Sequence, residues 1–246
     1  MPQRANNGAS MMPTVILTRP KAQSESFAAE LRAGWDGPPV DIIVSPLIEI
    51  VSVKVTCPAP DAVIFTSANG VSASGQFGLP QGLNAWCVGP KTAKLAHDAG
   101  FDPIVGPGDA DGLVADVIAA RPKGKLAHIR GMHARGDISI RLNAAGITCA
   151  DVVAYDQKAL ALTPEAKSTI AAQNTVIFPL FSPRSATILN DKGPFVAPTL
   201  VIALSEAVKS AVSPNISRQI TVADRPDGSA MLAAVLEMLR AQIGRS

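Results

Sequence analysis

The sequence predicts an α/β fold: two similar lobes, each built on a parallel sheet, joined by a two-stranded β-ribbon with a cleft between the lobes. Apolar runs of strand length alternate with helical periodicity along most of the chain, which is typical of βα units. Matching units recur in the same order, which indicates an internal duplication. Two strand-like stretches interrupt that order and predict the connection between the lobes.

The repeated units come in four pairs. In the first pair, residues 14–20 (TVILTRP) and 126–131 (LAHIRG) are strands that end near an arginine and lead into a helical pattern. In the second pair, residues 62–71 and 175–186 each begin with an apolar run that contains VIF and end in small polar residues. The pairs in full are 14–20 with 126–131, 62–71 with 175–186, 83–100 with 199–212, and 106–120 with 223–239. Because one match could arise by chance but four in one order are unexpected, we predict a duplicated lobe.

The predicted domain boundaries follow from the stretches that come after the two arginine-containing strands. One stretch is rich in proline and the other closes at Pro164. One full set of units lies between these stretches and the other lies outside, so one lobe is discontinuous. The predicted organisation is a disordered tail at 1–12, a discontinuous domain at 13–37 and 165–246, linker strands at 38–57 and 151–164, and an inserted domain at 58–150. The linkers are expected to pair antiparallel and to act as a hinge.

The composition fits a globular chain and argues against several classes of function. Of 246 residues, 47% are hydrophobic and 17% are charged, with a formal net charge of +2. We expect no nucleic-acid partner, because there is no basic excess, and no membrane span, because Gly and Pro break the longest uncharged run at 62–90. Three cysteines without a C-x-x-C spacing, and no apolar signal segment, predict reduced thiols in the cytoplasm.

Small polar residues follow several predicted strands, at the place where parallel α/β sheets bind ligands. Helices that start there present free backbone N–H groups, and the helix dipole favours an anion. The same residue types are also ordinary helix caps, and that interpretation stays open for each of them. The candidates for substrate binding are Thr66, Ser67, Ala68, Asn69, Gly89, Thr92, Ser182, Pro183, Arg184 and Ser205.

Two arginines and a tyrosine complete the candidate site. Arg19 and Arg130 end matched strands at one edge, where each is either a carboxylate clamp or a surface arginine that pairs with a local acid. Tyr155 is the only tyrosine, and its phenol either donates a proton to a departing hydroxyl or packs as an amphipathic side chain. His128 and His133 lie near the second arginine and are expected to make peripheral contacts at most.

Motifs for cofactors and metals are missing from the sequence. The segment GPGDADG does not complete a G-x-G-x-x-G fingerprint, and there is neither a Walker loop nor a G-x-S-x-G elbow. The histidines have no metal-ligand partners at useful spacing. We therefore expect a site that works without a cofactor or a metal.

Seven segments, taken in chain order, resemble the uroporphyrinogen-III synthase family. They are VILTRP, VIFTSANGV, CVGPKTAKLAHDAGF, GDADGL, VVAYDQ, FSPRSA and ADRPDGSAML, and together they span most of 13–240. The resemblance implies two α/β lobes on a two-stranded ladder, and a monomer. It also implies cofactor-free cyclisation of the linear tetrapyrrole hydroxymethylbilane to uroporphyrinogen III, with ring D inverted, for haem, sirohaem or corrinoid synthesis. A transient handover from the preceding deaminase would supply the substrate.

The resemblance also assigns roles to residues. The hydroxyl positions of the family fall on Thr66, Ser67, Thr92 and Ser182, and its tyrosine falls on Tyr155, which would assist departure of the substrate hydroxyl. The chain departs from the pattern at 203–208, where ALSEAV replaces a segment like IGPTTA, so the role of Ser205 stays open. Two other functions remain possible on the sequence: a non-catalytic two-lobed binding protein for an anionic small molecule, and a catalytically silent relative.

Overall fold

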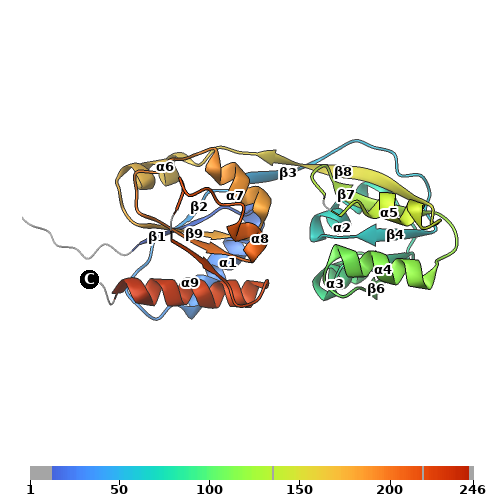
Figure 1. Cartoon of the computed structure of the whole chain (residues 1–246), viewed down its shortest axis with the longest axis horizontal. Coiled ribbons are helices and arrows are strands. Elements are labelled where there is room, and N and C mark those ends of the chain that lie inside the picture. Colours follow the sequence, from blue (N-terminus) through green and yellow to red (C-terminus); the bar gives the residue numbers. More distant parts are fainter. Residues whose placement is uncertain (1–12, 135, 218, 244–246) are drawn as a thin grey trace, which may run out of the picture. The chain divides into compact units, whose positions relative to one another are not determined.

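The computed structural model describes residues 13–134, 136–217 and 219–243 of the chain, so the predicted tail at 1–12 lies outside the described residues. The chain divides into two compact units. The first unit holds the described residues up to Glu49 and from Ala159 onward, and the second unit is Ile50–Lys158. Each unit has a mainly parallel sheet with helices on both faces (Figure 1). The structure is therefore of the mixed α/β class with parallel sheets, as the sequence predicts.

The sheet of the first unit has all its strands parallel, in the order β11-β10-β9-β1-β2. Its strands are β1 (Thr14–Leu17), β2 (Ile42–Val44), β9 (Val176–Leu180), β10 (Thr199–Ala203) and β11 (Gln219–Val222). Every residue of β1 and β9 is buried. This explains why these strands read as continuous apolar runs instead of alternating patterns.

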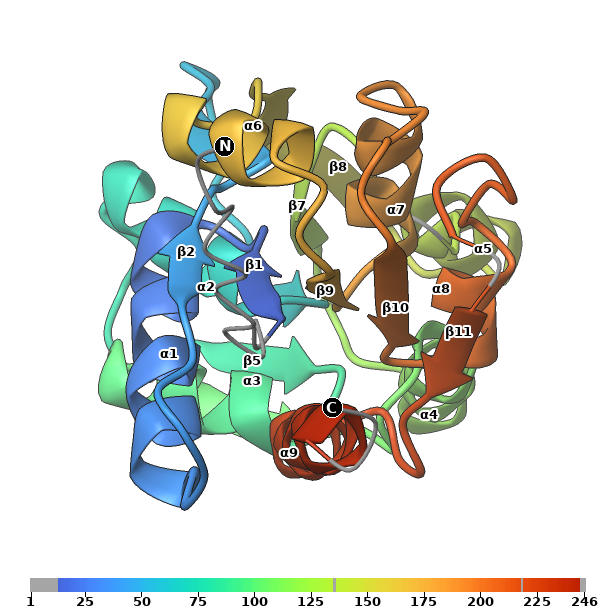
Figure 2. The ribbon, with the colours of Figure 1, turned by 90° about the vertical axis from the view of Figure 1, so that its left-hand side faces the viewer.

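Helices cover both faces of this sheet, as Figure 2 shows. The helices α1 (Lys21–Gly34) and α9 (Gly228–Ile243) lie on one face, and α6 (Pro164–Ala171), α7 (Pro183–Asn190) and α8 (Glu206–Lys209) lie on the other. The core between the sheet and the first two helices includes Val15, Leu17, Phe27, Leu31, Ile177, Met231 and Val235. The buried positions of α1 recur at helical spacing, so this one apolar face fixes the helix on the sheet.

The sheet of the second unit has the order β3-β8-β7-β4-β5-β6. Its strands are β3 (Ile48–Ser52), β4 (Ala62–Phe65), β5 (Asn84–Cys87), β6 (Asp102–Val105), β7 (Leu126–Gly131) and β8 (Cys149–Ala159). The ladders from β8 to β6 are parallel. Hydrogen bonds from Val53 N to Ala154 O and from Leu160 N to Leu47 O, each 2.9 Å long, flank the β3–β8 pair. Residue numbers rise on one strand as they fall on the other, so β3 and β8 run antiparallel.

The helices of the second unit also form two layers. The helix α2 (Ala68–Ser74), with the 3₁₀ turn η1 (Gly75–Phe77), shares one core with α3 (Pro90–Asp98). The helices α4 (Ala110–Ala120) and α5 (Ile138–Ala144) share the core on the other face with Ile64, Trp86 and Leu126. Among the described residues, no helix has the length and apolar character that crossing a membrane requires.

The two sheets repeat one strand order. In the second unit β6-β5-β4-β7-β8 matches β11-β10-β9-β1-β2 of the first, with the strands paired as the repeated sequence units predict. The same parallel register recurs as well, because Ile64 lies opposite His128 in one sheet and Ile177 lies opposite Val15 in the other. This agreement supports the internal duplication and makes Ile177 and Val15 of the first sheet the counterparts of Ile64 and His128 of the second.

Candidate active site

Ser67 and Tyr155 meet at the carboxyl end of β4. Ser67 Oγ lies 2.9 Å from the Tyr155 hydroxyl oxygen, although the two residues are far apart in sequence. Ser67 is also the N-cap of α2, where its Oγ accepts a hydrogen bond from Gly70 N–H at 3.2 Å. The capping interpretation of Ser67 is therefore confirmed, and the same oxygen has a second partner in the phenol.

Tyr155 is both a packing residue and a polar one. It is only 6% exposed, and its ring belongs to the core formed with α2 and α3. Its position in β8 is opposite Gly131, at an irregularity in the ladder between β7 and β8. The phenol hydroxyl is the polar end of a side chain that is otherwise held by apolar contacts, so its place is well defined.

Thr66 makes a contact that the sequence does not predict. Its Oγ1 lies 3.3 Å from Nε2 of His128, whose Nδ1 lies 3.4 Å from Oδ1 of Asp151. His128 is 1% exposed, and this contact with a candidate residue gives it a closer place beside the site than the sequence predicts. Contact with His128 is the largest cause that holds the pKa of Asp151 well below its ordinary value, and the hydrogen bond from Arg130 adds to it.

The two candidate arginines have different surroundings. Arg130 lies inside β7 and donates from Nη2 to Asp151 Oδ2 at 2.8 Å, so the interpretation as an arginine paired with a local acid describes it. Arg19 follows β1, and its Cζ lies 4.2 Å from the centroid of the Phe181 ring. Among the described residues Arg19 has no ion pair. Burial lowers the pKa of its guanidinium below the ordinary value, and the charge of Glu30 offsets part of this effect. The two arginines are therefore not equivalent: Asp151 pairs directly with Arg130, whereas Arg19 has only a longer-range attraction to Glu30.

The remaining candidates of the second unit lie at the starts of two helices. Ala68 and Asn69 form the first turn of α2 and are partly exposed. Gly89 is the N-cap of α3, and a Cβ on it would lie 3.4 Å from the Gly108 Cα. Thr92 is buried in the first turn of α3. These positions suit contacts through backbone N–H groups more than through side chains.

The candidates of the first unit lie at α7 and α8. Ser182 caps α7 by accepting from Ser185 N–H at 3.1 Å, which confirms the capping interpretation there. Pro183 and Arg184 form the first turn of that helix. Ser205 precedes α8 but makes no capping hydrogen bond through its side chain. The departure from the family pattern at 203–208 thus coincides with a short helix that lacks a side-chain cap.

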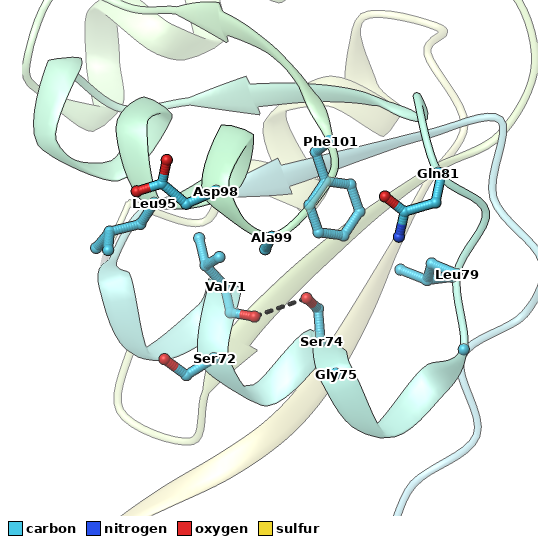
Figure 3. A pocket seen from close by; sticks show the side chains of 11 residues that line it. Val71, Ser72, Ser74, Gly75, Leu79, Gln81, Leu95, Asp98, Ala99 and Phe101 are labelled. Atoms are coloured by element: carbon cyan, nitrogen blue, oxygen red, sulfur yellow. Dashed lines mark hydrogen bonds between the residues drawn. The ribbon is translucent and has the colours of Figure 1, made fainter.

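The described residues of the second unit form a larger and a smaller hollow that bear on the candidate site in different ways. The larger, of about 460 Å³, lies beside α2 and η1 and is lined mainly by Val71, Ser74, Leu79, Leu95 and Phe101 (Figure 3). None of the described residues that line it is a predicted site residue. The smaller, of about 80 Å³, is lined by Ala134, Ile138, Ile140 and the polar side chains of His128, Arg130, Asp137 and Asp151. Only the smaller hollow touches the chain of contacts that leads to Thr66.

Within the described parts of the chain, no group of three or more His, Cys, Asp or Glu side chains could hold a metal ion. In each unit, taken by itself, the candidate residues offer hydroxyls and helix-start amides, and Arg19 of the first unit has no ion pair among the described residues. These groups can donate hydrogen bonds to anions and exchange protons between oxygens.

Comparison with known proteins gives one consistent family. The family model described as uroporphyrinogen-III synthase HemD matches residues 37–233. The uroporphyrinogen-III synthase of Chlorobaculum parvum is 30% identical over 162 residues, which is 59% of this chain and 64% of that protein. The match thus spans less than two thirds of the relative's length.

Two solved structures have the same fold. Uroporphyrinogen-III synthetase from Helicobacter pylori superposes with a TM-score of 0.65 at 16% identity, covering 92% of this chain and 100% of that one. A mutant uroporphyrinogen III synthase from Thermus thermophilus gives 0.51 at 14% identity, covering 95% and 100%. With the family match over most of its length, the chain belongs to the uroporphyrinogen-III synthase family.

Proposed function

We propose that the protein converts hydroxymethylbilane to uroporphyrinogen III and water, with inversion of ring D and without a cofactor. Membership of the family supports this activity. The observation that carries it to this chain is the 2.9 Å contact between Tyr155 and Ser67 at a strand end. That contact supplies a proton donor backed by a second hydroxyl, which is what the first step of the reaction needs.

In the first step Tyr155 donates its phenolic proton to the terminal hydroxyl of the bilane. The C–O bond breaks, water leaves, and an azafulvene cation remains on the substrate. Ser67 then donates its own hydrogen bond to the phenolate oxygen of Tyr155, while Gly70 N–H donates to Ser67 Oγ. This order of donors spreads the negative charge toward the start of α2, where the helix dipole stabilises it.

In the second step the pyrrole chemistry proceeds within the substrate. Ring D attacks the cation through its substituted carbon and forms a spirocyclic pyrrolenine, which fragments and closes again with ring D inverted. A proton is lost from the final ring and returns to the phenolate of Tyr155. The contribution of the protein is to hold the hindered carbon within reach, because correct orientation of reacting groups lowers the entropy cost of closure.

The carboxylates of the substrate require partners that leave the pyrrole rings free to react. We assign them to helix-start amides and to Arg19, whose guanidinium has no ion pair among the described residues. The proposed substrate contacts are Arg19, Thr66, Ser67, Ala68, Asn69, Gly89, Thr92, Ser182, Pro183 and Arg184, with Ser205 the least supported. Arg130 is assigned a structural role, because Asp151 already neutralises it.

Several wider features belong to the same proposal. The antiparallel pair of β3 and β8 is proposed as the ribbon that links two lobes and allows hinge motion. The reaction is proposed to take place in the cytoplasm, on substrate received from the deaminase that makes the bilane.

The direct test is the isomer composition of the product. Hydroxymethylbilane is generated in situ, the protein is added, and the products are oxidised and separated by chromatography. We expect the type III isomer to dominate. Type I alone, formed at the uncatalysed rate, would sink the assignment, and a titration of bilane binding would then separate a binding protein from a silent relative.

A further inference from the structure

A chain of polar contacts crosses three strands of the second unit and ends at the candidate site. In the sheet ladder Ile64 of β4 lies opposite His128 of β7, and His128 lies opposite Asp151 of β8. Thr66 follows Ile64 by two residues, and its Oγ1 lies 3.3 Å from His128 Nε2. The strand register itself therefore places an acid, an imidazole and a hydroxyl in a row.

The first unit shows what this part of the sheet looks like without those groups. At the equivalent positions Ile177 of β9 lies opposite Val15 of β1, and Val15 lies opposite Ile42 of β2. Val15 is fully buried, in the core formed with α1 and α9. A sheet of the same strand order is thus built with valine and isoleucine where the second unit has His128 and Asp151.

A sheet of this strand order does not require a histidine at this position. A buried imidazole loses its hydration and needs hydrogen-bond partners in return. His128 is 1% exposed, and within the described residues its Nδ1 has no partner in hydrogen-bond geometry, with the Asp151 oxygen at 3.4 Å. Only the imidazole of the pair is buried, because the Asp151 side chain is 33% exposed. Apolar side chains of similar volume are often at least as stable as a buried polar one. The contribution of His128 to function therefore lies in the contact that its other ring nitrogen, Nε2, makes with Thr66.

We propose that His128, oriented by Asp151, is a positioning residue that fixes the Thr66 hydroxyl in the bilane site, an inference that rests on the proposed function. The carboxylate of Asp151 faces Nδ1, which favours the tautomer with the proton on that nitrogen. Nε2 then accepts the hydroxyl proton of Thr66. With its proton committed to His128, Thr66 Oγ1 is left as an acceptor, which matches a pyrrole N–H of the substrate and not a carboxylate.

Nitrogen-15 NMR of the imidazoles tests the hydrogen-bond direction without any measurement of activity. The protein has three histidines, so His128→Gln identifies the signals of His128 by their loss. We expect the proton on Nδ1, and a shift of the Nε2 resonance in Thr66→Val. A proton on Nε2, or an Nε2 chemical shift that is the same in wild type and in Thr66→Val, overturns the proposal.

Kinetics test the positioning role. His128→Val introduces the residue of the first unit, and we expect the rate of type III formation to fall about 3- to 10-fold, the effect of one lost hydrogen bond. Thr66→Val is expected to cost about as much, and the double variant no more than the worse single variant. His128→Gln, whose side-chain oxygen can take the place of Nε2, is expected to recover most of the rate.

The control is His97→Gln, which removes an exposed histidine from the same unit and is expected to leave the rate unchanged. Melting temperatures identify any variant that fails to fold. Additive losses in the double variant, or a His128→Gln rate as low as that of His128→Val, overturn the positioning role. A wild-type protein that forms only the type I isomer instead removes the proposed function, and the tautomer experiment still decides the direction of the hydrogen bond.

Discussion

The backbone of Gly131 lies directly against the ring of Tyr155. A Cβ built on Gly131 would lie 2.5 Å from Tyr155 Cε2 and 2.7 Å from Cζ, closer than a side chain can approach. The two residues face each other across the irregularity between β7 and β8. The absence of a side chain at position 131 therefore gives the phenol the room to reach Ser67.

Replacing Gly131 by alanine is expected to displace the tyrosine ring. The overpacking should lower the free energy of unfolding by about 1–3 kcal/mol, and the rate of type III formation should fall with it. Chemical denaturation and the isomer assay measure the two effects. Gly75→Ala is the matched control, because a Cβ at Gly75 meets nothing within 4 Å and its φ of −56° suits alanine. Equal effects of both substitutions would refute the steric role of Gly131.

Tyr155→Phe removes the proposed proton donor and keeps the buried ring. We expect kcat to fall about 100-fold, since general acid catalysis commonly contributes that much or more, while KM changes little. Ser67→Ala should lower kcat less, because Ser67 acts through the phenol. Steady-state kinetics with in situ substrate measure both. Unchanged turnover in Tyr155→Phe would remove this residue from the mechanism.

Arg19→Gln is expected to weaken substrate binding without unfolding the protein. Loss of a charge-assisted hydrogen bond to a carboxylate should raise KM about 10-fold and leave the melting temperature nearly unchanged. Arg130→Gln provides the contrast, because Asp151 would lose its 2.8 Å partner and the main effect should be on stability. An unchanged KM in Arg19→Gln would exclude a carboxylate contact at this position.

The free energy of unfolding is expected to fall at acid pH because of the Asp151 carboxyl. Contact with His128, followed by the hydrogen bond from Arg130, lowers its folded-state pKa below the unfolded value of about 3.9. The unfolded state therefore takes up the proton first as the pH falls. The stabilisation is complete above that value and is lost as the pH falls toward the folded-state pKa.

Asp151→Asn tests this loss of stability, because the amide does not titrate. We expect the difference in unfolding free energy between wild type and Asp151→Asn to stay constant from about pH 6 to about pH 5 and to shrink from there to about pH 3. Urea denaturation across that range gives the difference directly. A difference that stays constant with pH would show that the carboxyl does not contribute through its charge.

The sequence predicts the parallel α/β class and the pairing of repeated units because both depend on local patterns. Strand-length apolar runs are readable in the chain, and so are the serines that cap α2 and α7. Tyr155 is a candidate on the sequence because it is the single tyrosine and because the family's tyrosine falls on it, but no pattern indicates that its partner is Ser67. That contact depends on an irregular ladder, which local spacing does not encode.

The contacts of His128 could not be predicted for a related reason. The partners of a polar residue in a buried strand are the residues opposite it on the neighbouring strands. For His128 these are set by the register of the β4, β7 and β8 ladders, which the sequence does not give. The sequence matches Arg19 with Arg130 because each arginine stands near the end of an apolar run, but the strands end at different points. Arg130 lies within β7, while Arg19 lies two residues beyond β1, so similar end motifs occupy different positions in the two sheets.

The hydrogen bond from Leu160 N to Leu47 O joins the two points at which the chain leaves and re-enters the first unit. The second unit is one uninterrupted stretch of chain, while the first unit is cut in two, with its cut ends held side by side at this bond. Neighbouring antiparallel strands need only a two-residue turn to join them. The second unit is thus an insertion in the first. Deleting it and joining the cut ends by a short hairpin would leave all five strands of the first unit's sheet, and the core beneath them, in the chain.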